Sequence, residues 1–131
     1  MARAKRPTRE LGMISHTEIA STDPVATRRF LERVFRWDFA TVKTPAGERF
    51  SFHTTGGADG SVRKTRSGEL PASINYVLVE DLALAESEIK KTGGEIVLPR
   101  VDVPRMGSFF WFKVPGGPVL ACWQDAPDRE S

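Results

Sequence analysis

The sequence has 131 residues, of which 40% are hydrophobic and 27% are charged, and its formal net charge is +2. This length suits one domain that buries its own core. The small net charge argues against nucleic acid as the main partner. No apolar run approaches the roughly 20 residues that cross a bilayer, and the single cysteine, Cys122, excludes an internal disulfide. We therefore expect a cytoplasmic protein without membrane contact.

Charged and polar segments lie at both ends of the chain. The first ten residues include four lysines and arginines, and no apolar stretch of signal-peptide type follows them. We expect residues 1–11 to be a disordered basic tail and residues 125–131 to be a second tail. Between them we predict a single domain at 12–124, with modules at about 12–68 and 72–124.

The first half of the chain reads as a strand, a helix and three strands. Residues 12–19 alternate as a strand does. Asp23 is a typical N-cap, and Pro24 suits the first helical position, so a helix is predicted over 24–35. Further strands are predicted at 37–43, 49–55 and 61–66.

The second half repeats this plan. A strand is predicted over 73–79, and Asp81 caps a helix over 82–92 that ends at Gly93 and Gly94. Three more strands are predicted at 95–103, 107–114 and 119–124, the last two joined by the turn "PGGP".

The sequences of the two halves can be aligned with each other. An offset of 58–59 residues places His16 over Asn75 and Asp23 over Asp81. The predicted fold class is therefore α+β, with two tandem βαβββ modules. Their curved mixed sheets are expected to form a cup-shaped cleft with the helices outside.

Three segments in this order resemble the vicinal-oxygen-chelate superfamily. They are "ISHTEIASTDPVATRRFLERVFRWDF", "INYVLVEDLALAESEIKKTGGEIVLPRV" and "GSFFWFKVPGGPVLACWQ". That superfamily contains glyoxalase I, bleomycin-resistance proteins and extradiol dioxygenases, and the chain resembles its small bacterial lactoylglutathione lyase-related proteins. Arg36 stands where such relatives usually have glycine, which implies about 1 kcal/mol of strain if its backbone is left-handed.

The resemblance implies where a metal would be held, with one ligand from the first and one from the last strand of each module. The first-strand position falls on His16, a histidine as in the metal enzymes. The fifth-strand position falls on Asn75, and the eighth falls on Ala121, which cannot coordinate an ion. The fourth falls near Ser61 or Arg63, where an arginine would repel a cation. We therefore expect no metal at this site and no other cofactor.

A remodelled metal site is the alternative. Strand alternation puts Glu18 on the same face as His16, and His53 ends a neighbouring strand. These three side chains would make a two-histidine, one-carboxylate set for a divalent ion. Three roles for His16 stay open. It can be a structural histidine that is hydrogen-bonded to Asn75 or Glu18 and has no function, a ligand-orienting or acid–base group, or a metal ligand. His16 and Glu18 are the candidates for catalysis.

The other candidates describe a largely apolar cleft wall with a few polar points, which is typical of a small-molecule pocket. In residues 107–114, Phe109 and Trp111 share one face of the strand and Phe110 and Phe112 share the other. The sequence leaves open which pair lines the cleft, because a one-residue slip reverses the faces. The predicted ligand-binding residues are His16, His53, Arg63, Asn75, Trp111, Ala121 and Trp123.

Two kinds of function follow from these residues. The first is a metal-free small-molecule binding protein, similar to the antibiotic-sequestering members of the superfamily, which work as dimers. A homodimer is expected, and the apolar run 109–112 would suit its interface. The alternative is a divalent-metal-dependent lyase or isomerase related to lactoylglutathione lyase, or catalysis by His16 and Glu18 without metal. The shared fold does not choose among them, so whether the chain is an enzyme stays open.

Overall fold

The computed structural model describes residues 9–54 and 57–127, and these ranges contain eight strands and two helices. The chain divides into two compact units. Unit 1 contains His16–Ile74, and unit 2 contains Arg9–Ser15 together with the chain from Asn75 onward. Among the described residues no helix is long and apolar enough to span a bilayer.

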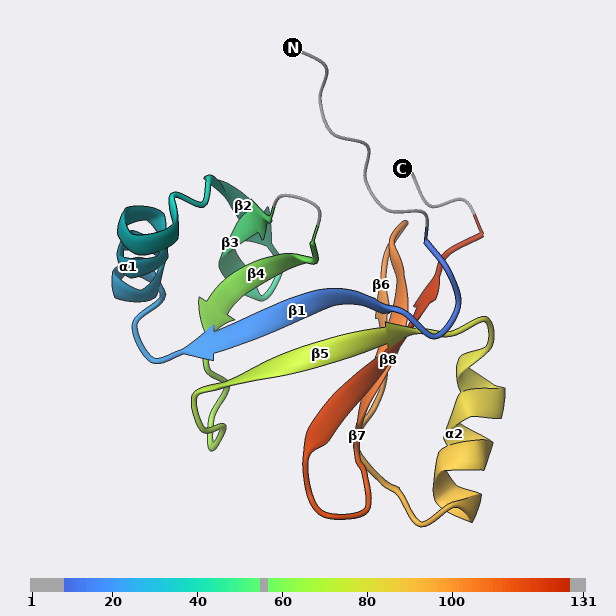
Figure 1. Cartoon of the computed structure of the whole chain (residues 1–131). Coiled ribbons are helices and arrows are strands. Elements are labelled where there is room, and N and C mark those ends of the chain that lie inside the picture. The colour runs from blue at the N-terminus through green and yellow to red at the C-terminus, as the bar shows by residue number, and fades with distance from the viewer. Residues whose placement is uncertain (1–8, 55–56, 128–131) are drawn as a thin grey trace. The chain divides into compact units, whose positions relative to one another are not determined.

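Unit 1 holds four strands and one helix (Figure 1). In chain order they are β1 (Ile14–Ser21), α1 (Pro24–Phe35), β2 (Phe39–Thr44), β3 (Gly47–His53) and β4 (Asp59–Lys64). The strands lie in the order β2-β3-β4-β1, with β3 antiparallel to both of its neighbours and β1 parallel to β4.

Unit 2 repeats this arrangement. Its elements are β5 (Ala72–Leu78, whose first three residues belong to unit 1), α2 (Leu82–Lys91), β6 (Glu95–Val103), β7 (Gly107–Lys113) and β8 (Val119–Asp125). They lie in the order β5-β8-β7-β6, with β5 parallel to β8 and the other pairs antiparallel. The predicted α+β class and its two tandem βαβββ modules are confirmed.

Both helices begin at the aspartates that the sequence indicated. The Asp23 carboxylate accepts the N–H of Ala26 at 3.1 Å. The Asp81 carboxylate accepts the N–H groups of Ala83 and Leu84 at 2.8 and 3.1 Å. These bonds satisfy amide groups that have no partner within the helix. Each module therefore starts its helix with the same cap.

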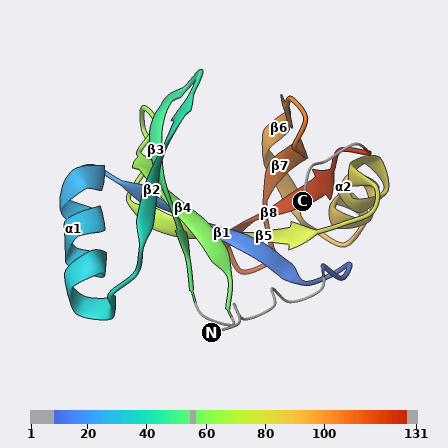
Figure 2. The same cartoon turned by 90° about the horizontal axis from the view of Figure 1, so that it is seen from above.

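The aromatic core of unit 1 lies on the α1 side of its sheet. Phe52 is buried and stacks on Trp37 with ring centres 4.7 Å apart. The guanidinium of Arg28, from α1, lies over the rings of Phe39 and Phe50. In Figure 2, α1 runs beside β2 and β3. On the opposite face, β3 and β4 carry polar residues.

In unit 2, α2 covers the face of the sheet that carries Phe110, Phe112 and Cys122, and Leu82 completes this buried cluster. Burial raises the pKa of the Cys122 thiol to about 11. The question left open by the sequence is thereby settled: Phe110 and Phe112 pack under the helix, and Phe109 lies on the opposite face.

The expectation that the run 109–112 offers an apolar surface to a second chain is wrong for most of its members. Phe109, Phe110 and Phe112 are all buried within the chain. The reason is that one face of β7 supports α2 while the other contributes to an aromatic cluster described below.

The predicted tails fall partly outside the described residues, since 1–8 and 128–131 are not described. Arg9, inside the expected first tail, binds both carboxylate oxygens of Asp125 at 3.1 and 2.8 Å. Asp125 is the last residue of β8. Arg9 and Asp125 both belong to the predicted tails, and this ion pair joins them.

Arg36 ends α1 in the left-handed conformation, with φ 59° and ψ 29°, and its N–H binds the carbonyl of Glu32. A side chain with a Cβ meets a steric cost in this conformation that glycine avoids. We predict that Arg36→Gly stabilises the protein by about 1 kcal/mol, measured by urea unfolding. Arg33→Gly, in the last turn of the helix, is the control and should cost about 1 kcal/mol instead. Equal destabilisation by both changes would contradict the assignment.

Candidate functional site

The face of the unit 1 sheet opposite α1, here called the polar face, carries side chains that line up in rows across β3, β4 and β1. The strand registers place Asp59 beside both His16 and His53, and Ser61 beside both Glu18 and Ser51. The residues of the polar face are His16, Glu18, Arg49, Ser51, His53, Asp59, Ser61 and Arg63.

Glu18 is the central acid of this face. Its side chain is only 5% exposed, and each carboxylate oxygen meets a different arginine. Nη1 of Arg49 donates to Oε2 at 2.7 Å, and Nε of Arg63 lies 2.8 Å from Oε1. A buried carboxylate is costly unless it is paired. The two arginines supply that pairing from β3 and β4.

Arg63 is held on its other side by Glu69. Nη1 and Nη2 bind the two oxygens of Glu69 at 2.7 and 2.8 Å, a two-point contact that suits the planar guanidinium. Glu69 also accepts the N–H of Arg66 at 2.9 Å. We call Glu18, Arg49, Arg63 and Glu69 the ion cluster. Its two acids and two bases balance in charge.

Within the ion cluster, contacts between Arg63 and Glu69 shift the pKa of both groups towards their charged forms. Burial opposes the positive charge of Arg63, but the hydrogen bonds and charges of Glu69 and Glu18 outweigh it and raise the pKa of Arg63. The hydrogen bond from Arg63 lowers the pKa of Glu69, helped by the N–H of Arg66 and opposed by burial. Arg63 is therefore a permanent cation that already has its counterions.

His16 and His53 flank Asp59 in adjacent strands. Nδ1 of His53 lies 2.6 Å from Oδ1 of Asp59, and both side chains are accessible to solvent. Such a contact needs a proton on Nδ1, because the carboxylate oxygen can only accept. The structure thus pairs His53 with Asp59 and places His16 beside Asp59 in register. In the predicted set of His16, Glu18 and His53, the carboxylate is committed to arginines.

Asn75 is not the counterpart of His16. The two N-caps, Asp23 and Asp81, are 58 residues apart, and this offset pairs His16 with Ile74. Asn75 is exposed, and its buried neighbour Tyr76 is the residue in register with Ala121. The overlay made from the sequence was therefore one residue out of register here, which reverses the face of the strand.

The unit 2 face opposite α2 is aromatic. Trp111 Nε1 donates to the hydroxyl of Tyr76 at 2.9 Å, and Phe109 contacts the rings of both Tyr76 and Trp123. Trp123 Nε1 donates to Asp125 at 2.8 Å. Ala121, Trp123, Phe109 and Tyr76 are buried, and Trp111 is half-buried. Of these aromatic side chains, Trp111 is the one most accessible to a ligand.

These positions do not suit a metal ion. Of the four expected ligand positions, only His16 carries a usual metal ligand. The others hold Asn75 (Ile74 in the corrected alignment), Ala121 and the Ser61–Arg63 segment. In residues 9–54 and 57–127 no group of three or more His, Cys, Asp or Glu side chains is arranged to hold an ion. The guanidinium of Arg63 adds a positive charge at this point. The donor set therefore does not fit the divalent ion that the resemblance implied.

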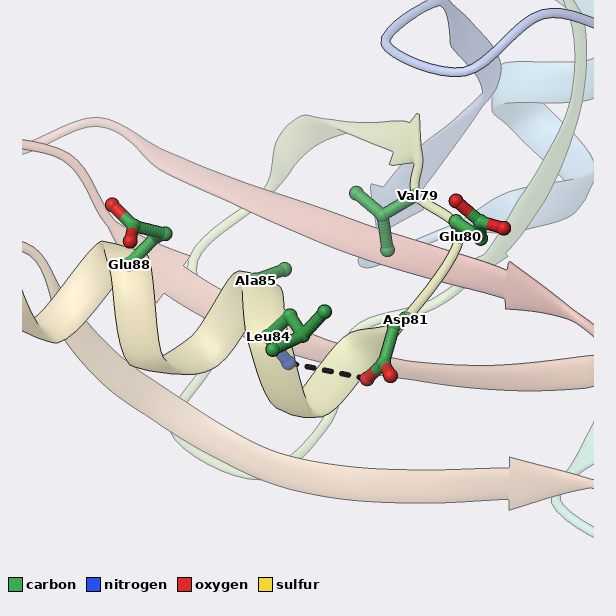
Figure 3. Close-up of a pocket in the computed structure, with 6 residues that line it drawn as sticks. All are labelled: Val79, Glu80, Asp81, Leu84, Ala85 and Glu88. Carbon is green, nitrogen blue, oxygen red and sulfur yellow. Dashed lines mark hydrogen bonds between the residues drawn. The ribbon is translucent and has the colours of Figure 1, made fainter.

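A surface hollow lies elsewhere, at the start of α2 in unit 2 (Figure 3). None of the site residues predicted from the sequence lines it. It is lined by Val79, Glu80, Asp81, Leu84, Ala85 and Glu88, which we call the acidic hollow.

Sequence reasoning missed Arg49, Asp59, Glu69 and Tyr76. Asp59 was hidden because β4 starts at Asp59, two residues before the predicted strand. Arg49 could have been found from its alternation with His53 along β3. Glu69 lies in the connection between the modules, and no periodic signal marks it. Tyr76 was missed through the register error at Asn75.

Comparison with known proteins gives distant relatives. No protein-family model matches the chain. It is 24% identical over 126 residues to "Putative glyoxylase CFP32" of Mycobacterium bovis and to the protein of the same name in Mycobacterium tuberculosis. The match covers 92% of this chain but 48% of those proteins. The chain therefore spans about half the length of the curated relatives it matches.

Solved structures resemble the chain more closely in fold. A hypothetical protein, BH1468 from Bacillus halodurans C-125, has a TM-score of 0.71 at 13% identity, covering 93% of this chain and all of that one. Methylmalonyl-CoA epimerase from Mycobacterium tuberculosis gives 0.66 at 12%, covering 86% and 87%. A glyoxalase/bleomycin resistance protein/dioxygenase superfamily member from Vibrio splendidus 12B01 gives 0.65 at 16%, covering 84% and 97%. At these identities the likeness concerns the fold.

The ion cluster makes Glu18 a residue on which stability depends. Glu18→Gln leaves the buried Arg63 with a missing charge partner, so we predict a loss of about 3–5 kcal/mol in the free energy of unfolding. The same change at Glu86, whose ion pair with Lys90 is exposed, should cost about 0.5 kcal/mol. Adding Arg63→Met to Glu18→Gln should recover part of the loss. Similar small costs at both glutamates in urea unfolding would show that the cluster contributes little.

Glu69 gives the stability of the protein a defined dependence on pH. Its pKa in the folded state is lowered below the ordinary 4.5. Its contribution is therefore complete above about pH 4.5 and is lost as the pH falls towards the folded value. Urea unfolding between pH 3 and 7 should show a steeper acid loss for the wild-type protein than for Glu69→Gln. Parallel curves for the two proteins would contradict this assignment.

Proposed function

Because the chain has the vicinal-oxygen-chelate fold, we propose that it binds a small, partly apolar molecule and that it does so without a divalent metal ion. The observation that carries the proposal is the buried, ion-paired Arg63 on the polar face. A guanidinium whose charge is fixed cannot leave room for a second cation in the same place. Glu18, the carboxylate nearest to it, is already neutralised by two arginines.

The remaining groups of the polar face support ligand binding. Arg49 is partly exposed and uses Nη1 on Glu18, so other donors of its guanidinium can meet an anionic or carbonyl group. His16 and the His53–Asp59 pair add groups that accept or donate a proton. Within unit 2, Trp111 is a separate, half-buried aromatic side chain that an apolar group can contact. A methylmalonyl-CoA epimerase with methylmalonyl-CoA bound is among the solved structures of this fold, which is a precedent for an organic ligand.

The alternative is a divalent-metal-dependent lyase or isomerase related to lactoylglutathione lyase. The name of the curated relatives favours it, but it would need donors that the described residues do not bring together. We further propose that the protein is cytoplasmic and acts as a homodimer.

Metal content decides between these functions. We predict that the purified protein holds no stoichiometric nickel, zinc or manganese by elemental analysis, and that its melting temperature is the same with each ion and with EDTA. A site filled at 100 times its Kd would stabilise the protein by about 2.7 kcal/mol, which a melt detects. His16→Ala should respond like the wild type, with His53→Ala as the matched control. Stoichiometric metal, or stabilisation that His16→Ala abolishes, would establish the lyase or isomerase instead.

Ligand binding is tested separately with a probe that is both aromatic and anionic, 8-anilino-1-naphthalenesulfonate. Its fluorescence should titrate to saturation on the native protein. Arg49→Gln should weaken this binding about tenfold, while Lys43→Gln, an exposed change of the same kind, should leave it unaltered. Weak binding that never saturates, or equal effects of both changes, would argue against a ligand on the polar face.

A further inference from the structure

The polar face of unit 1 has an apolar margin on β2, the outermost strand of this unit (Figure 1). Arg28 of α1 contacts Phe39 and Thr41 from the helix side. Ala40 and Val42, which alternate with them, therefore point to the opposite, polar face. Both are exposed, and Val42 is 42% accessible to solvent. Two exposed apolar side chains thus border the charged and hydroxyl groups of this face.

The register of β2 and β3 joins this margin to Arg49. Val42 is the partner of Arg49, and Ala40 is the partner of Ser51. Side chains paired in this way have Cβ atoms about 5 Å apart. The methylene stem of Arg49 therefore starts beside Val42, and its guanidinium binds Glu18 on β1. Because arginine stems offer apolar surface along their length, an apolar strip runs from Val42 along Arg49.

The guanidinium of Arg49 is the cationic end of this strip. Nη1 donates to Glu18, and the side chain of Arg49 stays 28% exposed. Its other N–H groups can donate to the oxygens of a ligand, and a carboxylate suits their geometry. The ion cluster already balances in charge, so it accommodates one added negative charge better than two. A singly charged head group therefore fits this position.

The separation of the two ends sets a length for the ligand. Glu18 draws the guanidinium of Arg49 from β3 towards β1, over the intervening β4. β2 and β4 are two strand spacings apart, which is about 10 Å. An extended chain of about eight carbons covers this distance, since a C–C bond measures about 1.5 Å. A shorter chain would end over the stem of Arg49 without reaching Val42.

From this arrangement we propose that unit 1 binds a medium-chain aliphatic carboxylate, with its head group on Arg49 and the end of its chain on Val42 and Ala40. The inference rests on the proposed function and gives its ligand a chemical class. It uses residues of unit 1 alone. Val42 is the residue that selects chain length, because only a chain that crosses β3 gains apolar contact there.

Titration of the full chain with butanoate, hexanoate and octanoate, followed by amide NMR, tests this ligand class. A methylene that leaves water completely raises affinity about fourfold, and one that lies on a surface raises it about twofold. Octanoate should therefore bind about fourfold more tightly than hexanoate. The amide signals of β2 should shift with octanoate and stay in place with butanoate.

Val42→Thr tests the chain-length residue, because it removes apolar contact and keeps a β-branched side chain of the same size. It should leave the affinities for butanoate and hexanoate unchanged and abolish most of the gain at octanoate. Val97→Thr, at an exposed position of β6 that is 40% accessible, is the matched control and should keep the full gain. Ala40→Val adds apolar surface to the same margin and should increase the gain.

Arg49→Gln separates the head group from the chain. It should weaken all three carboxylates about tenfold and leave the ratio between octanoate and hexanoate unchanged. Carboxylates that bind without a gain at octanoate, or with a gain that Val42→Thr retains, would overturn the role of β2. Failure of the carboxylates while the naphthalenesulfonate still binds through Arg49 would overturn the ligand class and leave the proposed function standing. Failure of both probes would overturn both.

The charge of the head group is tested with octyl phosphate at pH 8, which carries about two negative charges. It should bind no more tightly than octanoate, because the Glu18 carboxylate lies beside the guanidinium and repels the second charge. Tighter binding of octyl phosphate would overturn the assignment of a singly charged head group. Far-UV circular dichroism accompanies each variant, because an unfolded chain would imitate a loss of binding.

Discussion

The contact between Glu18 and Arg63 is the constraint from which the rest of unit 1 follows. Both side chains are only 5% exposed, so neither charge is tolerable without the other. Arg49 and Glu69 complete the neutralisation from a neighbouring strand and from the connection between the modules. The same pairing decides the chemistry of the polar face, because it commits both oxygens of its buried carboxylate to arginines.

Most of the fold could be predicted from local signals in the sequence. Asp23 and Asp81, each followed by apolar residues at helical spacing, predicted where both helices begin. The predicted bounds of β6, 95–103, are those of the structure. The repeat of strand, helix and three strands led to the tandem modules. Strand ends are harder to predict than helix starts, because alternation can continue into a turn. The predicted start of β4, at residue 61, lies two residues after its start at Asp59.

The candidate site could be predicted only in part. Strand alternation correctly placed Glu18 on the same face as His16. The partners of Glu18 and Arg63 could not be predicted, because pairing across strands depends on register. Glu69 lies outside any periodic pattern. An alignment error of one residue placed the exposed Asn75 in the predicted site, where the structure has its buried neighbour Tyr76.

The place of Glu69 in the chain has a consequence for the order of folding. It binds Arg63 from only six residues away, whereas Glu18 is separated from Arg63 by a helix and two strands. Closing a short loop costs less entropy than closing a long one. The arginine can therefore acquire its first counterion while β1 is still unpaired. A guanidinium that is already paired and oriented is then buried by β1 at a smaller desolvation cost.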